Sequence, residues 1–195
     1  AGQVIYLVYS TQCHQLPERS FFLFGAQPMY SLDQIHAAWQ NTANPFILRQ
    51  FIGTPTMGWK VAWSDRMVSL FTSLFGIGVA YALLRRMLKP LPLWGLALLA
   101  LPMALDGGSH LISDIGGIGL GFRDSNALLG TLTQHILPAT FYAGEARGSF
   151  NSWLRLVTGV LFGLGVVWAL YPLVQASLAD AGREIEGGKR VARAA

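Results

Sequence analysis

The sequence predicts an all-α protein, a polytopic bundle of transmembrane helices with an amphipathic helix and structured loops on its outer side. Of the 195 residues, 52% are hydrophobic and only 12% are charged, about half the charged fraction of a typical soluble domain. Three long apolar stretches are suited to crossing a bilayer, and polar residues gather near one end of each stretch. We therefore interpret residues 1–195 as a single membrane domain.

The composition also excludes several classes of protein. Too few charged residues remain to cover an ordinary soluble enzyme, and an aromatic content of 12% is too high for a disordered chain. The net charge of +4 is spread along the chain, whereas a nucleic-acid-binding protein gathers its basic residues in one patch. The single cysteine, Cys13, excludes an internal disulfide and a cysteine-rich zinc module.

The first residues are apolar but cannot cross a membrane by themselves. The apolar segment 3–9 is far shorter than the roughly 20 residues that a spanning helix needs. Residues 3–24 are therefore interpreted either as a partial span, whose beginning precedes Ala1, or as an interfacial helix.

Residues 25–66 follow as an outer segment with its own helix. Ser31 is followed three positions later by Gln34, which is the spacing of a capping box at a helix start. Apolar residues then recur on one helical face through residue 39. Residues 31–41 are thus predicted to form a short amphipathic helix on the membrane or on the protein.

Three spans are predicted, at residues 67–84, 91–112 and 154–174. The first has no charged residue in 18 positions, near the lower limit for crossing roughly 30 Å of hydrocarbon. The third contains Gly159 and Gly163, whose spacing is typical of helices that pack closely in lipid.

The basic residues predict an orientation. Three of them lie in loop 85–90 between the first two spans, which favours a cytoplasmic position for this loop. The tail 175–195 carries four basic residues and is then cytoplasmic as well. By alternation, the outer segments 25–66 and 113–153 face the opposite side, as expected for a protein of the bacterial inner (plasma) membrane.

Polar side chains gather where the predicted spans end on the outer side. Ionisable groups at membrane depth are costly, so they normally pair with each other or line a polar cavity. Because the predicted topology places all of them on one side, we expect a shared polar site. Its expected members are Glu18, Arg19, Asp65, Arg66, Asp114, Arg123, Asp124 and Arg155, with Cys13, His14, Asp106 and His110 beside them.

The residue types leave several interpretations of this site open. Asp106 and His110 are four residues apart and share a helical face, so with Cys13 and His14 they offer ligand types suited to zinc. Alternatively, the carboxylates pair with the arginines, which keep their charge when buried, and hold the helix ends together. An arginine left without a carboxylate would instead bind an anionic lipid head group or a phosphate.

Several stretches resemble an uncharacterised family of prokaryotic membrane proteins, domain of unknown function 2085. They are residues 13–20 (CHQLPERS), 64–66 (SDR), 101–107 (LPMALDG) and 154–163 (LRLVTGVLFG). The resemblance implies a transmembrane segment before the Cys-His motif. It implies no activity, because the family has none to carry over. Many members have a Cys-x-x-Cys pair near the second motif, where this chain has Ser64 and Met67.

Two functions are consistent with the sequence. The first is an accessory or structural subunit of a larger membrane complex, with a polar cap on the non-cytoplasmic side. The alternative is a membrane-embedded zinc enzyme that uses Cys13, His14, Asp106 and His110. The expected partners are the lipid bilayer and other membrane subunits, and no nucleic acid is expected.

Overall fold

The computed structural model describes residues 2–194, with side chains described for residues 4–186. In this part of the chain, three helices are long and apolar enough to cross a membrane. They are α4 (Asp65–Leu84), α5 (Leu93–Asp114) and α9 (Phe150–Ala194). The first two lie close to the predicted spans, whereas α9 continues well past residue 174. The predicted tail is therefore helical through Ala194, and its basic residues beyond 186 lie outside the described side chains.

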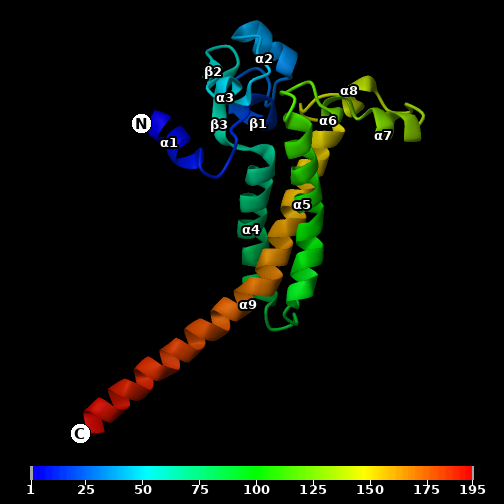
Figure 1. The fold of residues 1–195 in the computed structure, drawn as a ribbon. Coiled ribbons are helices and arrows are strands. Elements are labelled where there is room, and N and C mark those ends of the chain that lie inside the picture. The colour runs from blue at the N-terminus through cyan, green and yellow to red at the C-terminus, as the bar shows by residue number, and fades with distance from the viewer. Residues whose placement is uncertain (1, 195) are drawn as a thin grey trace.

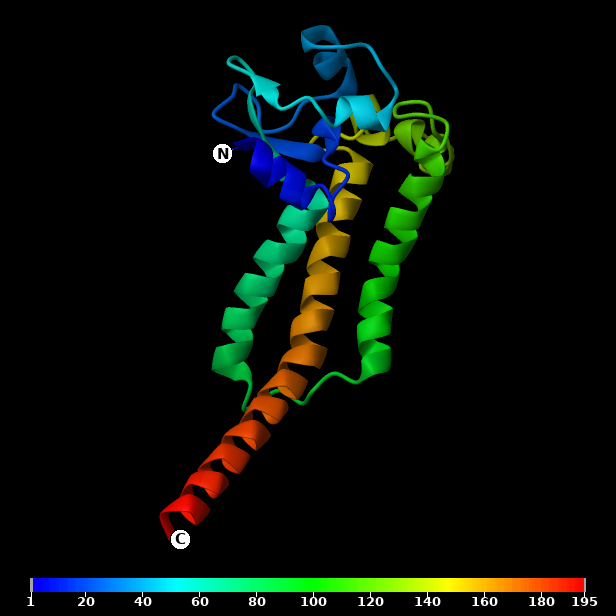
Figure 2. The same cartoon turned by 60° about the vertical axis from the view of Figure 1, so that its left-hand side comes forward.

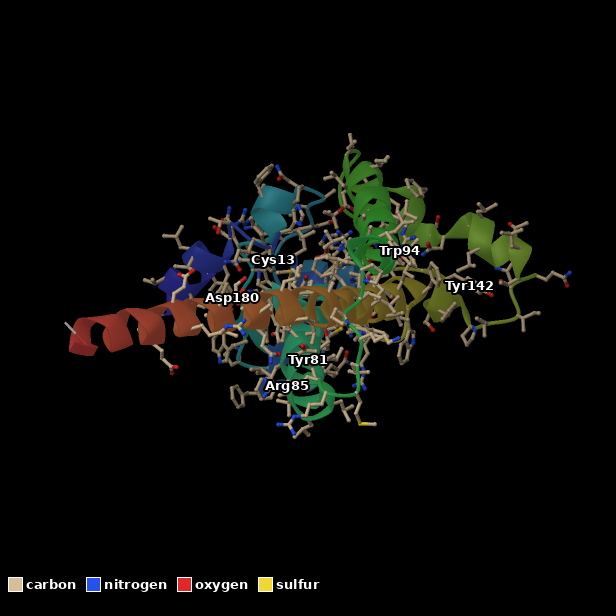
Figure 3. The ribbon with its side chains drawn as sticks, turned by 90° about the horizontal axis from the view of Figure 1, so that it is seen from below. Cys13, Tyr81, Arg85, Trp94, Tyr142 and Asp180 are labelled. Atoms are coloured by element: carbon tan, nitrogen blue, oxygen red, sulfur yellow. The ribbon has the colours of Figure 1, made fainter. Side chains whose placement is uncertain are left out.

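Helix α9 lies between α4 and α5 and packs against both (Figure 1, Figure 2). Seen from below, Tyr81 on α4 and Trp94 on α5 lie on opposite sides of α9 (Figure 3). The Trp168 indole of α9 donates to the Lys89 backbone carbonyl over 2.8 Å, which ties the α4–α5 loop to α9. α9 is thus the central helix of the three.

The close contact between α4 and α9 depends on small residues, two glycines of α9 and two serines of α4. A Cβ atom added at Gly159 would lie 2.0 Å from the Ser69 hydroxyl, and one at Gly163 would lie 2.0 Å from the Ser73 hydroxyl. The Ser69 hydroxyl also donates across the interface to the Leu156 backbone carbonyl over 3.1 Å. The prediction of close packing at the two glycines is confirmed, and two serines of α4 supply the facing surface.

The residues between α1 (Gly2–Tyr9) and α4 form a small folded region at one end of the three helices (Figure 1). We call this region, residues 10–64, the cap. Its elements are η1 (Pro17–Arg19), β1 (Ser20–Leu23), α2 (Leu32–Ala38), α3 (Pro45–Leu48), β2 (Gly53–Thr54) and β3 (Gly58–Ser64). The strands form an antiparallel sheet with β3 between β1 and β2.

The cap has a hydrophobic core of its own. Ile35 of α2 and Leu48 of α3 are fully buried there, and Phe22 of β1 packs beside them. The predicted capping box is present, since the Ser31 hydroxyl accepts from the Gln34 backbone and the Gln34 side chain accepts from the Ser31 backbone. The apolar face of α2 therefore rests on the protein.

The chain is mostly helical, at 62%, but the sheet corrects the all-α prediction. Helix α1 ends at Tyr9, and residues 20–23 form a strand, so residues 3–24 do not form one helix. Four residues in β1 are too few to establish an alternating pattern in the sequence. The β2–β3 turn depends on Gly58, which has a φ of +77° and whose added Cβ would meet the Leu23 carbonyl at 2.2 Å.

Short helices fill the connection between α5 and α9. They are α6 (Phe122–Ser125), α7 (Ala127–Leu132) and α8 (Ala139–Tyr142), and they lie at the same end as the cap (Figure 1). The Asn126 side-chain amide donates to the Arg123 and Tyr142 backbone carbonyls over 2.7 and 2.8 Å. The connection thereby positions Arg123 beside Asp106 of α5, near the ends of the long helices.

Candidate functional site

The predicted polar clusters meet where the cap rests on α4, α5 and α9. Arg155 lies one turn and a half inside α9 and is 2% exposed. Its Nε donates to the Asp65 carboxylate at the start of α4 over 2.7 Å. Its other nitrogens donate to the Glu145 carboxylate and, over 2.9 Å, to the Glu145 backbone carbonyl. Buried charges persist only when they are paired and hydrogen-bonded in this way.

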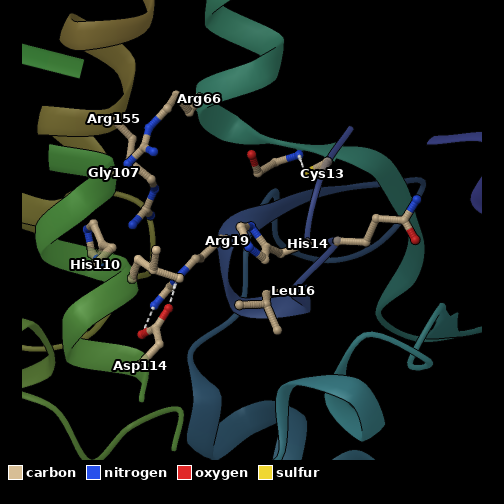
Figure 4. Close-up of a pocket in the computed structure, with 12 residues that line it drawn as sticks. Cys13, His14, Leu16, Arg19, Arg66, Gly107, His110, Asp114 and Arg155 are labelled. Atoms are coloured by element: carbon tan, nitrogen blue, oxygen red, sulfur yellow. Dashed lines mark hydrogen bonds and ion pairs between the residues drawn. The ribbon is translucent and has the colours of Figure 1, made fainter. Parts of the chain in front are cut away.

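Arg19 connects the cap to α5. Its guanidinium donates to both oxygens of the Asp114 carboxylate, over 2.7 and 2.8 Å, in the two-pronged geometry that favours arginine (Figure 4). The same group reaches one Glu145 oxygen at 3.3 Å. Glu145 therefore contacts arginines from both the cap and α9.

Asp106 is shared by two arginines. Arg66 of α4 donates to one of its oxygens over 2.5 Å, and Arg123 of α6 donates to the other over 2.8 Å. His110 lies one turn further along α5, with its Nε2 atom 3.6 Å from the Asp106 carboxylate and 3.2 Å from an Arg123 nitrogen. The predicted common face of Asp106 and His110 is confirmed, but arginines surround it.

The four residues expected to bind zinc are not assembled as one ligand set. Among the described residues, no group of three or more His, Cys, Asp and Glu side chains has the geometry to hold a metal ion. The Cys13 sulfur accepts from the Ser64 backbone N–H at 3.4 Å, and His14 is exposed. Cys13 and His110 lie on opposite sides of a pocket (Figure 4).

That pocket is a cavity of about 70 Å³ between the cap, α4 and α5. It is several times larger than the space that one water molecule needs. Arg19 and His14 line it from the cap, Arg66 from α4, His110 from α5 and Arg155 from α9. The site thus has both a set of paired charges and an adjoining hollow.

Asp124 is the one predicted member that makes no ion pair among the described residues. Its carboxylate accepts from the Gly121 backbone N–H over 2.9 Å and caps the first turn of α6. Its role is local, because it fixes the helix that carries Arg123.

Sequence reasoning missed Glu145 and Lys60. Glu145 lies in a loop without periodicity, so nothing in the sequence indicated that its carboxylate would contact Arg19, His110 and Arg155. Lys60 lies in β3 and is 3% exposed. Its ammonium group donates over 2.7 Å to each of two backbone carbonyls, those of Gln15 and Arg49.

Burial shifts the protonation of two groups in the cap. It raises the pKa of the Glu18 carboxyl to about 7, against the smaller opposing effect of Arg19. It lowers the pKa of the Lys60 ammonium to about 7, against the opposing effect of Glu18. Neither Glu18 carboxylate oxygen has a hydrogen-bond partner among the described residues.

Together, three helices suited to crossing a membrane and a buried charge cluster under a small cap define a predicted membrane protein. The chain belongs to the family described as predicted membrane protein, domain of unknown function 2085, whose model matches residues 55–169. The resemblance noted in the sequence is thereby confirmed, although the motif at residues 13–20 precedes the matched range.

The chain is also similar to a protein without an assigned function. The chain is 25% identical over 171 residues to an uncharacterized protein of Methanocaldococcus jannaschii. The aligned region covers 87% of this chain and 67% of that protein. No solved structure shows a significant match to the chain.

Proposed function

We propose that this protein is an integral membrane accessory subunit, which docks on a partner subunit through the part of α9 that extends beyond α4 and α5. Its cap then faces the non-cytoplasmic side, and loop 85–90 and the C-terminus face the cytoplasm. The exposed end of α9 is the observation that carries the proposal.

Helix α9 has 45 residues, a length of roughly 68 Å at 1.5 Å per residue. That is more than twice the roughly 30 Å of hydrocarbon in a bilayer. Contacts of α4 with this end of α9 include the Tyr81 ring against Tyr171 and the Tyr81 hydroxyl at 3.4 Å from Gln175. From residue 173 to residue 186 every residue is exposed.

The exposed end of α9 has an apolar stripe. Leu178, Ala181 and Ile185 are three and four residues apart and therefore share one face. Leu178 is 68% exposed and Ile185 is 60% exposed. An isolated helix as short as residues 173–186 is marginally stable in water unless its apolar face packs against another surface. We therefore expect a helix of the partner subunit to pack on the stripe.

The charge cluster supports a structural role for the opposite end. Arg66 and Arg123 occupy both Asp106 oxygens, and the Arg123 guanidinium also lies against His110. Two of the four groups required by the zinc-enzyme alternative are therefore already engaged by cations. Such pairing holds α4, α5 and α6 together without any reaction, and the Arg19–Asp114 pair joins the cap to α5.

The test replaces the apolar stripe by charge in the full-length chain. We expect Leu178→Glu with Ile185→Glu to abolish co-purification of the partner after mild detergent extraction, because two carboxylates cannot be buried against an apolar helix. The matched control is Ala176→Glu with Ala179→Glu, which adds the same charge away from the stripe and should retain the partner.

Three outcomes contradict the proposal. Equal loss of the partner in both double variants would show that charge alone is responsible. Migration of the wild-type chain as a single copy without other proteins would exclude a stable complex. About one zinc ion per purified chain would favour the enzyme alternative.

A further inference from the structure

We propose that the pocket beneath the cap binds a phosphate group, carried by a phosphomonoester lipid or free in solution. The inference is independent of the docking proposed for α9, because the pocket lies at the opposite end of the molecule (Figure 1, Figure 4). Three features of the pocket support phosphate binding. They are the arginines in its lining, buried N–H groups that lack a hydrogen-bond acceptor in the described part of the chain, and an opening at the level where the apolar helices meet the cap.

The lining carries an excess of positive charge. Three guanidinium groups, those of Arg19, Arg66 and Arg155, line the pocket together with a single carboxylate, that of Asp114. The Asp65, Asp106 and Glu145 carboxylates pair with the arginines but are not part of the lining. A group that enters the pocket therefore meets three guanidinium groups and one carboxylate in the lining, while the carboxylates that neutralise the arginines lie behind it. Arginine is well suited to bind phosphate oxygens.

Two buried N–H groups of arginines that line the pocket have no hydrogen-bond acceptor among the described residues. They are the Nε atoms of Arg19 and Arg66, and the Arg19 Nε lies 3.9 Å from a Glu18 carboxylate oxygen. The Nδ1 atom of His110 is also buried without a hydrogen bond to any of these residues, and a Glu145 carboxylate oxygen lies 3.5 Å from it. A buried donor without an acceptor costs free energy, typically 1–3 kcal/mol for each group. Phosphate oxygens are strong acceptors and would satisfy such donors.

The opening lies where the apolar helices meet the polar cap. Among the lining residues, Leu111 on α5 is 63% exposed and His14 in the cap is also exposed. Leu111 belongs to a helix suited to crossing the membrane, so it faces lipid when α5 spans the bilayer. A molecule with a phosphate head and an apolar tail can place the head among the arginines and the tail along α5.

The experiment measures the thermal unfolding midpoint of the full-length chain in detergent. The probes are dioctanoyl phosphatidic acid, inorganic phosphate, and dioctanoyl phosphatidylcholine as a zwitterionic control at matched ionic strength. We expect phosphatidic acid to raise the midpoint saturably and phosphatidylcholine to leave it unchanged. An equal response to inorganic phosphate would also support the site and would identify free phosphate as the source.

Two arginines provide a matched pair of variants. Arg66 and Arg123 donate to the two oxygens of the same carboxylate, that of Asp106, but only Arg66 lines the pocket. We expect Arg66→Gln to weaken the apparent affinity for phosphatidic acid about tenfold, the effect of losing one charge-assisted contact. Arg123→Gln should keep the wild-type affinity.

A second variant protects the test against misfolding. His14 is exposed, so His14→Glu should fold and should weaken binding by placing a negative charge at the opening. A response to none of the anionic probes would overturn the proposal. Equal affinity losses in Arg66→Gln and Arg123→Gln, or wild-type affinity in both Arg66→Gln and His14→Glu, would overturn it as well.

Discussion

Glu18 and Lys60 show how individual charged residues are accommodated in the cap. Lys60 donates to two backbone carbonyls, so its ammonium group has hydrogen-bond partners even though burial lowers its pKa. The Glu18 carboxyl is 1% exposed, and its nearest ion-pair contact is with Arg19 at 3.9 Å. The cap therefore favours the protonated form of Glu18, and ionisation of this group opposes folding.

The raised pKa of Glu18 in the folded chain predicts that stability depends on pH. The pKa of Glu18 is about 7 in the folded chain against a model-peptide value of 4.5. Its stabilising contribution is therefore complete below pH 4.5 and is lost as the pH rises through 7. The loss amounts to roughly 3 kcal/mol. Glu18→Gln should remove this loss, so the variant should gain stability relative to the wild type between pH 4.5 and pH 8.

Chemical unfolding of both proteins across this pH range measures the effect. Glu18 also raises the pKa of the Lys60 ammonium, so the difference between the two proteins includes the effect on Lys60 of losing the Glu18 charge. A difference in unfolding free energy that stays constant from pH 4.5 to pH 8 would show that Glu18 does not titrate as described.

At the scale of elements, the interface between α4 and α9 is set by small residues. The backbone oxygen of Arg66 lies 2.8 Å from where a Gly159 Cβ would be, so even a methyl group requires the helices to separate. Gly76, in the same helix as Ser69, has no atom within 4 Å of its added Cβ. The same glycine-to-alanine change therefore causes a clash at Gly159 and none at Gly76.

Gly159→Ala should accordingly lower the free energy of unfolding by about 1–3 kcal/mol, the usual cost of overpacking. Gly76→Ala should be neutral or slightly stabilising, because alanine favours helix by about 1 kcal/mol relative to glycine. Unfolding in mixed detergent gives both values. Equal effects of the two substitutions would mean that α9 does not approach α4 as closely as described.

The sequence predicted elements whose signal is local. The spans depend on runs of apolar residues, and the start of α2 depends on the pair Ser31 and Gln34, so both were found. The sheet was not predicted, because β1 and β2 are too short to show a period and are defined by pairing with β3.

Most of the residues expected at the candidate site lie close together in the structure, and their role as a functional site stays a prediction. Asp65, Asp106 and Arg155 lie at one end of the helices, where the predicted topology puts them. The choice of partners was not predictable, because it depends on side-chain reach between segments up to 126 residues apart, as for Arg19 and Glu145. A loop residue such as Glu145 carries no sequence signal of that reach.

At the scale of the whole molecule, the cap and loop 85–90 lie at opposite ends of the long helices (Figure 1, Figure 2). If the three helices cross the membrane, the two regions face different compartments. The basic residues of loop 85–90 favour the cytoplasm for that end. The orientation in our proposal follows from this arrangement.

Single cysteines in a Cys13→Ser background test the orientation. Ala37 in the cap and Met87 in loop 85–90 are both exposed. In intact cells, Ala37→Cys should react with a membrane-impermeant maleimide, whereas Met87→Cys should react only after lysis. The opposite pattern would invert the proposed topology, and the cysteine-free chain controls for background labelling.

The position of Arg155, 90 residues after its partner Asp65, has a consequence for biosynthesis. Asp65 leaves the ribosome 90 residues before the arginine with which it pairs, and Arg19 precedes Glu145 by 126 residues. The Asp65 carboxylate at the start of α4 therefore acquires its arginine partner only after α9 has been synthesised. Synthesis of α9 completes the cluster, so assembly of the cap on the helices depends on a segment made well after the cap itself.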